Sequence, residues 1–379
     1  MSADPTALYT RKNPFPAKLA VNRKLTGSGS AKDTRHFEID LTGSGVTYEV
    51  GDSLGVFPTN DPSLVSELLG VLGLTGGEIV PDTNGNPLTL REALLKFYVI
   101  TEMDKKLLAA IAEKEPAAAK FLLMVTPDGK DDLDDYLYGR EVIDALLEYP
   151  AAKFTAEEFV KVLRKLQPRL YSIASSQKAH PAAVHLTVAA VRYESNGRKR
   201  EGVCSTFLAD RADTVPVFVH TAKHFRVPEN TSTPVIMVGP GTGIAPFRAF
   251  LQERKVTGAT GKNWLFFGDQ KAETDFLYRE ELEAYQAEGV LNHLSLAFSR
   301  DQAEKIYVQH RMIEKADQLY AWLEEGAYFY VCGDAKRMAK DVDVALHRVL
   351  EISGGKSPKE AALYVSELKK LKRYVKDVY

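Results

Sequence analysis

The spacing of hydrophobic and polar positions changes three times along this chain. In residues 15–58 apolar and β-branched residues alternate with polar ones between glycine and serine turns, which predicts antiparallel strands. In residues 61–167 apolar residues recur every three to four positions, which predicts helices. The strand pattern resumes in residues 169–222. We therefore expect one β-domain that a helical segment interrupts, rather than two consecutive domains.

Strand and helix patterns alternate beyond Thr233. The apolar segments PVIMVG, NWLFFGD, LNHLSLAFS and YFYVCGD are separated by helical patterns, one of them over residues 276–288, and helices continue to Leu371. This alternation predicts a doubly wound parallel sheet. Ligands bind such sheets at the carboxyl ends of the strands, so the residues that follow each apolar segment are the candidates for a site.

A glycine-rich turn follows the first of these segments. It contains Gly239, Gly241 and Gly243, and a helical pattern begins at Ala245. Glycines let backbone N–H groups approach an anion closely, and a helix N-terminus favours negative charge. The turn therefore predicts a site for a phosphate ester. Its spacing is not that of G-x-G-x-x-G, so a turn without a ligand stays open on this pattern alone.

Polar and basic residues follow the third parallel strand. Ser299 and Arg300 end this strand, and Lys305, Tyr307 and Gln309 come soon after. Two cations, a hydroxyl and a planar ring suit a phosphate on an adenosine ribose, with the base stacked on the ring. A solvated charged loop would show the same pattern.

Three further positions, Asp269, Cys332 and Ser172, keep two interpretations on pattern alone, and for Ser172 one of them is an ordinary strand residue. Asp269 could bind the ribose hydroxyls of NADH or cap a turn, although the basic cluster favours NADPH. Cys332 ends a strand, where it could be a small core residue or a reactive group. His220 and His224 lie four positions apart in a segment that starts as a strand, so they form no helical ligand pair and we predict no metal site.

Composition narrows the functional class. A net charge of −2 gives no reason to expect nucleic-acid binding, and no apolar run is long enough to cross a membrane. The N-terminus lacks the apolar stretch of a secretory signal. Two distant cysteines do not indicate a disulfide framework, so we expect a cytoplasmic protein.

Nine segments resemble one family in their order along the chain. They are GDSLGVFPTND, PRLYSIASS, VHLTVAAVRY, GVCSTFLADR, GPGTGIAPFRAF, NWLFFGD, AFSRDQAEKIYVQ, YVCGDAKRMAKDV and RYVKDVY. Over almost the whole chain they resemble the ferredoxin–NADP reductase superfamily, and within it the FAD/NADPH-binding module of the sulfite reductase flavoproteins, in the diflavin reductase branch. The resemblance implies an antiparallel β-barrel FAD domain at residues 1–230, with a helical insertion at about 61–167, followed by a doubly wound NADPH domain at 231–379 with a C-terminal aromatic tail.

The resemblance also implies an FAD site. Arg169 would bind the pyrophosphate, Tyr171 would stack on the flavin, and Ser172 would lie near the flavin nitrogen that receives the hydride. Tyr379 would cover the other flavin face and would have to swing away to admit nicotinamide. The other implied FAD residues are Leu170, Thr187, Val188, Ala189, Gly202, Val203, Cys204 and Ser205.

An NADPH site is implied in the same way. Cys332 and Asp377 would flank the nicotinamide ring, and together with Ser172 and Tyr379 they are the predicted catalytic residues. The pyrophosphate residues would be Gly241, Thr242 and Gly243, and the residues for the 2′-phosphate and adenine would be Ser299, Arg300, Lys305, Tyr307, Gln309 and Asp341.

These residues predict an NADPH-dependent flavoprotein reductase. The named relatives carry a flavodoxin-like FMN domain before the barrel, and none precedes Phe15 here, so we expect electrons to pass from FAD to a separate protein in sulfite reduction. The candidate acceptors are a sulfite reductase haemoprotein, a flavodoxin or a ferredoxin. The alternatives are a ferredoxin or flavodoxin–NADP reductase and, in another class, a non-catalytic nucleotide-binding regulatory subunit.

A basic stretch near the C-terminus has two interpretations. It contains Lys369, Lys370, Lys372 and Arg373. It is either an ordinary solvated helix face or a docking patch for an acidic electron carrier.

Overall fold

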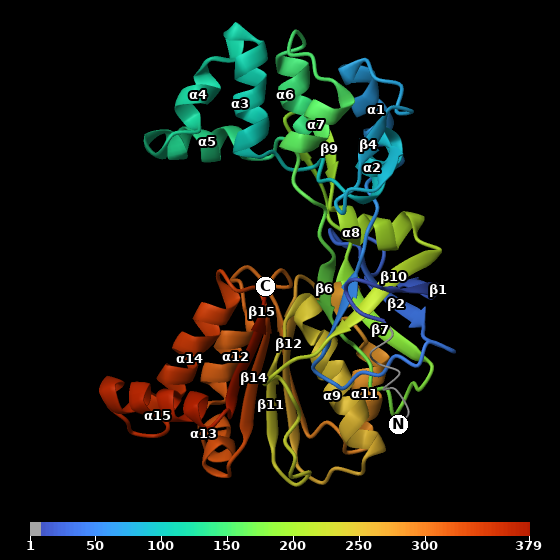
Figure 1. The fold of residues 1–379 in the computed structure, drawn as a ribbon. Coiled ribbons are helices and arrows are strands. Elements are labelled where there is room, and N and C mark those ends of the chain that lie inside the picture. Colours follow the sequence, from blue (N-terminus) through green and yellow to red (C-terminus); the bar gives the residue numbers. More distant parts are fainter. Residues whose placement is uncertain (1–8) are drawn as a thin grey trace. The chain divides into compact units, whose positions relative to one another are not determined.

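The computed structural model describes residues 9–379, which divide into two compact units (Figure 1). The first unit contains the chain up to Gly55, Leu170–Ala190 and Asp213–Tyr379, and the second contains Val56–Arg169 and Val191–Ala212. The predicted boundary after residue 230 stays a prediction. The first eight residues of the N-terminal segment, where no secretory signal is predicted, lie outside the described range. Within that range no helix combines the length and the apolar character that crossing a membrane requires.

An antiparallel sheet of six strands closes on itself as a barrel. Its order is β6-β3-β10-β1-β2-β7, and its two edge strands meet through the bridge between Ile173 and Leu186. The interior is apolar, with Phe37 and Ile39 fully buried. The predicted antiparallel barrel is therefore confirmed. Its strands are β1 (Phe15–Lys24), β2 (Thr34–Asp40), β3 (Ser53–Val56), β6 (Arg169–Ser172), β7 (Ala183–Ala189) and β10 (Thr214–His220).

A parallel sheet of five strands forms the rest of the first unit, in the order β13-β12-β11-β14-β15. Ile236 and Val238 of β11 point to the face that α12 to α15 cover, whereas Val235 and Met237 point to the face covered by α9 and α11 (Figure 1). This arrangement confirms the predicted doubly wound sheet. The strands are β11 (Val235–Val238), β12 (Asn263–Asp269), β13 (His293–Phe298), β14 (Tyr328–Gly333) and β15 (Tyr374–Val378).

The helices around this sheet agree with the apolar pattern, with one difference. A single helix predicted over residues 276–288 is wrong at its start, because Tyr278 takes a left-handed conformation (φ 55°) and α11 begins at Arg279. The helices are α9 (Ala245–Val256), α10 (Ala272–Asp275), α11 (Arg279–Ala287), α12 (Val308–Glu314), α13 (Ala316–Glu324), α14 (Met338–Ile352) and α15 (Pro358–Lys370), and the short turn η5 (Gly241–Ile244) precedes α9.

The segment after the last helix is a strand that the sequence pattern did not predict. β15 pairs in parallel with β14 and places Asp377 opposite Cys332. Arg373 anchors its start by donating to the carbonyl of Leu323 at 2.6 Å, and Tyr374 is 5% exposed. The chain end is therefore part of the sheet.

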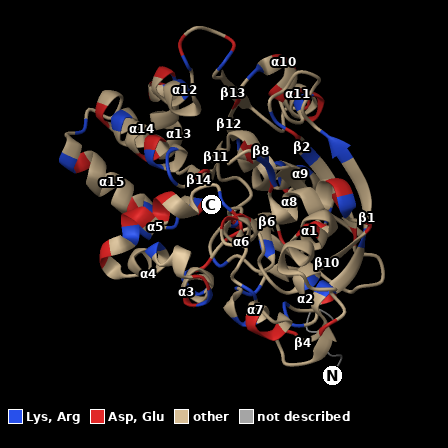
Figure 2. Cartoon of the chain, turned by 90° about the horizontal axis from the view of Figure 1, so that it is seen from above, with Lys and Arg blue, Asp and Glu red and all other residues tan. Residues whose placement is uncertain are grey.

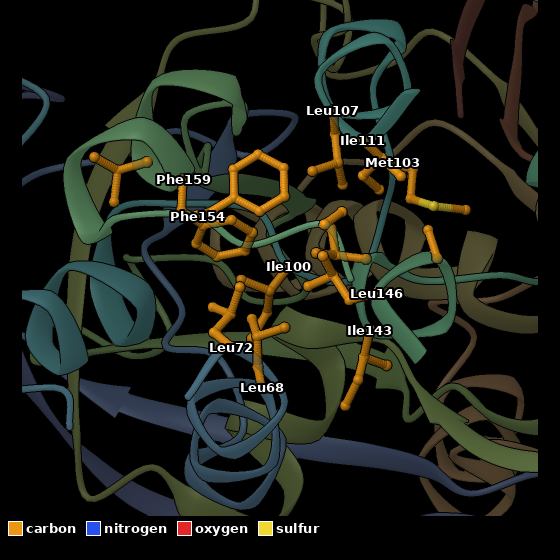
Figure 3. Close-up of a cluster of buried hydrophobic side chains, with 14 of the residues drawn as sticks. Leu68, Leu72, Ile100, Met103, Leu107, Ile111, Ile143, Leu146, Phe154 and Phe159 are labelled. Carbon is orange, nitrogen blue, oxygen red and sulfur yellow. The ribbon is translucent and has the colours of Figure 1, made fainter. Parts of the chain in front are cut away.

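Helices dominate the second unit. In Figure 3, Leu68 and Leu72 of α1 converge with Phe159 of α7 in a common core. Asp131, Asp132, Asp134 and Asp135 lie on α5, where Figure 2 shows acidic positions in red. The elements are α1 (Pro62–Leu72), α2 (Leu90–Lys96), α3 (Lys105–Lys114), α4 (Lys120–Met124), α5 (Lys130–Leu137), α6 (Val142–Glu148), α7 (Ala156–Val162), α8 (Val203–Thr206), β4 (Ile79–Pro81), β5 (Pro87–Thr89), β8 (Arg192–Ser195), β9 (Arg198–Glu201), and the short turns η2 (Pro116–Ala118), η3 (Pro127–Gly129) and η4 (Phe207–Arg211).

A buried polar network joins the barrel to α9 within the first unit. Arg248 of α9 donates to the carbonyl of Ala174 at 2.7 Å, to Nδ1 of His185 at 3.2 Å and to Glu281 at 2.8 Å. Its guanidinium also lies 4.7 Å from the ring centroid of Tyr278. These contacts fix the helix that follows the glycine turn against the end of β6.

The imidazoles of His36 and His185 and the carboxylate of Glu38 lie close enough together, within 4.8 Å, to resemble a metal site. A guanidinium can only donate, so Nδ1 of His185 accepts from Arg248 and Nε2 of the neutral ring carries the proton. That proton and the nearby positive charge both oppose a cation. We therefore assign these residues to the hydrogen-bond network.

Acid should destabilise the first unit through the two histidines. Burial, reinforced by Arg248, lowers the pKa of His36 to about 4 and that of His185 to about 2, from the ordinary 6.5. At a pH between these lowered pKa values and about 6.5, the unfolded chain binds more protons than the folded chain. The free energy of unfolding therefore falls as the pH drops below about 6.5. We expect a loss of about 2 kcal/mol per histidine between about pH 7 and about pH 5, measured by urea unfolding.

Variants separate this effect from general acid sensitivity. His185→Gln should show a smaller difference in the free energy of unfolding between the two pH values. His224→Gln, at an exposed position, should show the same difference as wild type. An unchanged difference in His185→Gln would contradict the assignment. The other titratable groups that act on these two histidines and on Arg248 are Glu38, Glu281, Tyr278, Tyr285, Arg23 and His180.

Candidate functional site

The carboxylate of Asp377 contacts two other predicted catalytic residues. Ser172 Oγ donates to Asp377 Oδ2 at 2.6 Å, and Cys332 Sγ lies 4.0 Å from the same oxygen. Ser172 ends β6 of the barrel, whereas Cys332 and Asp377 are partners on β14 and β15. The structure thus brings together a barrel residue and two residues of the parallel sheet.

The environment of Cys332 determines which form its thiol takes. Its side chain is fully buried, and burial, followed by the charge of Asp377, raises the pKa of the thiol well above its ordinary value. A thiolate is the nucleophilic form of cysteine, so Cys332 is not activated for covalent chemistry at neutral pH. Its neutral S–H group can orient a neighbour and fill space.

Tyr379 is tied to the glycine turn. Its hydroxyl lies 2.7 Å from the hydroxyl of Thr242, and its backbone N–H donates to the carbonyl of Gly333 at 3.1 Å. The side chain is nevertheless 59% exposed. Tyr379, which is predicted to cover the flavin, and Thr242, which is predicted to bind the pyrophosphate, are therefore hydrogen-bonded to each other.

The glycine turn is packed tightly on one side and open on the other. A Cβ on Gly243 would lie 2.2 Å from the carbonyl oxygen of Cys332, so a larger residue would push the turn away from β14. Gly241 has φ +57°, and the nearest atom to a Cβ there, Oδ2 of Asp269, is 3.8 Å away. This cradle, followed by η5 and α9, suits the close approach of a phosphate.

The residues predicted for the 2′-phosphate and adenine follow β13 or lie on α12 and α14. Arg300 and Lys305 are exposed, and Tyr307 is 42% exposed. Gln309 Nε2 lies 3.4 Å from Asp341 Oδ2, so the structure brings these two together. Ser299 stands next to β12, because its backbone N–H donates to the carbonyl of Asp269 at 2.9 Å. Exposed donors at this edge suit an anionic ligand.

Asp269 is paired with a lysine of the barrel. Lys32 Nζ, from the connection between β1 and β2, lies 2.5 Å from Asp269 Oδ1. The backbone N–H of Gln270 donates to the same oxygen at 2.7 Å. Asp269 is thus an ion-paired carboxylate that also stabilises its own turn. Sequence analysis missed Lys32 because the two residues are far apart in the chain and no local pattern links them.

The residues predicted beside the flavin are exposed to different degrees. On β6, Leu170 is 45% exposed and Tyr171 is half-buried. On β7, Thr187 is 4% exposed and its hydroxyl lies 2.7 Å from the hydroxyl of Tyr278. Because Val188 is also buried, Ala189 is the member of this predicted trio with a partly exposed side chain.

The remaining predicted FAD residues belong to the second unit. Arg169 is exposed there, and Gly202 is the N-cap of α8, which contains Val203, Cys204 and Ser205. Ser205 Oγ donates to the carbonyl of Gly202 at 3.1 Å and accepts from the N–H of Val191 at 3.1 Å. The structure brings these four residues together in one turn. Their role in binding FAD stays a prediction.

Two family models match this chain. Residues 8–207 match the FAD binding domain, and residues 237–343 match the oxidoreductase NAD-binding domain. The chain belongs to the FAD binding domain family. The two matches confirm the predicted kinds of cofactor, FAD and a nicotinamide dinucleotide.

Relatives of this FAD binding domain protein agree with the resemblance seen in its sequence. The chain is 48% identical, over 98% of its length, to the sulfite reductase [NADPH] flavoprotein alpha-component of Bacillus subtilis, and covers 62% of it. It is 50% identical over 99% of its length to the protein of that name from Aliivibrio fischeri, covering 62%, and 50% identical over 98% to that from Vibrio cholerae, covering 60%. It therefore spans about three fifths of these relatives.

We expect the thiols of this FAD binding domain protein to be unreactive while it is folded. Cys332 and Cys204 are both buried, so Ellman's reagent at about pH 8 should label neither within minutes, and both only in denaturant. Cys332→Ser should lower the denatured count by one and leave the native result unchanged. Rapid labelling of the native protein that disappears in this variant would contradict a neutral, enclosed Cys332.

Proposed function

We propose that this chain is an NADPH-dependent FAD oxidoreductase that passes electrons to a separate protein acceptor in sulfite reduction. The observation that carries the proposal is the shared oxygen of Asp377. It joins Ser172, predicted beside the flavin, to Cys332, predicted beside the nicotinamide. Two rings that react must be held in contact, and this cluster links the elements that would hold them.

The side chains of Ser172, Cys332 and Asp377 are proposed to orient the bound rings and to enclose them. An FAD held beside Ser172 and Tyr379 would supply hydride-accepting and one-electron chemistry there. Asp377 Oδ2 accepts a hydrogen bond from the hydroxyl of Ser172. This bond fixes the direction of the hydroxyl and leaves its lone pairs to face a ligand. The neutral, buried side chain of Cys332 fills the space beside the same carboxylate. A preorganised carboxylate can stabilise positive charge next to it without reorganising.

Tyr379 is proposed to be a gate coupled to the diphosphate. We propose that a nucleotide bound at Thr242 displaces the Tyr379 hydroxyl from that residue, which frees the exposed ring to move. The gate thus opens as a consequence of nucleotide binding.

Two Tyr379 variants test the gate. Tyr379→Phe removes only the bond to Thr242, so NADP⁺ should bind up to about fivefold more tightly, the equivalent of one hydrogen bond. Tyr379→Ala removes the ring and should change both the NADPH/NADH discrimination and the rate of flavin reduction in stopped flow. The proposal fails if Tyr379→Ala leaves both quantities unchanged.

The preference for NADPH is proposed from the charges at the carboxyl edge of the parallel sheet. Arg300 and Lys305 are exposed cations, whereas Asp269, the carboxylate that would suit the ribose hydroxyls of NADH, is paired with Lys32. Both features favour a ribose that carries a phosphate.

Anaerobic titration tests the cofactor pair. The purified protein should show a flavin spectrum that NADPH bleaches readily and NADH poorly. Arg300→Gln should raise the KM for NADPH about tenfold, as expected for a lost charged phosphate contact, and leave that for NADH unchanged. Arg348→Gln, on α14 outside the predicted site, is the matched control. A protein that fails to take up FAD would overturn the proposal.

The acceptor is proposed from the relatives alone. These relatives are named as components of sulfite reductase. A sulfite reductase haemoprotein is therefore the acceptor to test first, before a flavodoxin or a ferredoxin. The basic stretch offers little support for docking. Lys369 lies 3.4 Å from Asp343 and Lys370 lies 3.6 Å from Glu367, while Arg373 binds backbone carbonyls.

A further inference from the structure

The strand β15 presents different side chains to the two faces of the parallel sheet. Successive side chains of a strand point to opposite faces. Tyr374 and Val378 pack in the core beneath α14 and α15, whereas Val375 packs on the side of α9 and α11. Lys376 therefore points to the face of α14, and Asp377 points to the opposite face.

Asp343 of α14 binds two of the side chains that β15 presents to it. Its Oδ1 accepts hydrogen bonds from the Tyr374 hydroxyl at 2.9 Å and from Lys376 Nζ at 2.8 Å. Lys369 Nζ of α15 lies 3.4 Å from the same oxygen. Burial acts to raise the pKa of Asp343, but the hydrogen bonds from Lys376 and Tyr374 lower it below its ordinary value. A charged carboxylate thus joins α14, α15 and β15 at one atom.

The position of β15 along β14 decides where Asp377 lies. β15 is an edge strand, and among the described strands it pairs with β14 alone. The hydrogen bonds of a parallel ladder repeat evenly, so side-chain contacts must select the register. In the observed register Asp377 lies opposite Cys332. A shift by one residue would turn Asp377 to the other face, and a shift by two would carry it about 7 Å along β14.

Two side-chain anchors select this register, and they hold different parts of the strand. Arg373 donates to the carbonyls of Leu323 and Ala327, and it precedes the first residue of β15. Lys376, held by Asp343, directly precedes Asp377. The contact with Asp343 is therefore the anchor that lies nearer to the cluster.

We propose that Asp343 is a positioning residue for hydride transfer, because it holds β15 in the register that brings Asp377 to Ser172 and Cys332. The proposal rests on the proposed function, since it requires that this cluster acts on the bound rings. Asp343 binds β15 from the face opposite to Asp377, so it acts through the strand alone. Its loss slows the chemical step and leaves the binding of the nucleotide unchanged.

Alkylation of Cys332 tests the anchor without any cofactor chemistry. This thiol is buried beside β15, so iodoacetamide reaches it when the strand opens. Asp343→Asn keeps the shape of the side chain and removes its charge. Cys332 should then react at least about tenfold faster than in wild type, the equivalent of one lost hydrogen bond to a charged group. Peptide mass spectrometry separates Cys332 from Cys204 of the second unit, whose rate should stay unchanged.

Stopped-flow reduction of the FAD-loaded chain by NADPH tests the consequence. Asp343→Asn should lower the limiting rate at least about fivefold, because small displacements of reacting groups slow a reaction, and leave the dissociation constant of NADPH within about twofold. Asp343→Glu keeps the carboxylate, so its alkylation and reduction rates should stay within about threefold of wild type. Lys376→Gln breaks the same contact, and adding it to Asp343→Asn should cause little further loss.

Arg348→Gln is the matched control, because it removes an exposed ion pair with Glu351 from the same helix. It should equal wild type in both measurements. Unchanged alkylation of Cys332 in Asp343→Asn, an equal acceleration at Cys204, or weaker NADPH binding at an unchanged limiting rate would each overturn the role of Asp343. If the wild-type chain takes up FAD but NADPH does not reduce it, the proposed function fails instead, and alkylation alone decides whether Asp343 anchors β15.

Discussion

Buried Arg248 is the contact on which the arrangement of the first unit depends. Burying a guanidinium costs several kcal/mol unless its donors find acceptors, so few relative positions of α9 and the barrel satisfy it. Its bond to the carbonyl of Ala174 fixes the chain two residues after Ser172, and α9 itself begins directly after η5. One cation therefore sets the end of β6 against the glycine turn, and with it the approach of Ser172 to Asp377.

The cluster of Ser172, Cys332 and Asp377 depends on a single acceptor oxygen, Oδ2 of Asp377, that the other two side chains share. Asp377 holds Ser172 by a short hydrogen bond, and its charge also disfavours the thiolate of Cys332. A neutral thiol beside a carboxylate contributes no second negative charge, so the cluster can be enclosed at lower electrostatic cost. A thiol that stays protonated is also a poor nucleophile.

The elements with strong local patterns could be predicted from the sequence. β11, β12 and β14 are continuous apolar runs, and the glycine turn before Ala245 marks the start of α9. β15 was missed because its five residues mix apolar and charged side chains, and its stability comes from pairing with β14. The start of α11 was misplaced because Tyr278 takes a left-handed conformation to bury its ring, which no spacing of apolar residues reveals. Lys32 and Asp269 meet only through tertiary packing, so their pairing was beyond any reading of local sequence.

The close contact between Gly243 and the carbonyl of Cys332 has a consequence for protein engineering. Backbone atoms of Cys332 and Gly333 lie closest to a Cβ on Gly243, so the backbone sets the spacing between the turn and β14. Arg300 and Lys305, in contrast, are exposed side chains after β13. The residues proposed for coenzyme choice and those proposed for reaction geometry therefore occupy separate parts of the same sheet edge, and we expect that one set can be redesigned while the other is kept.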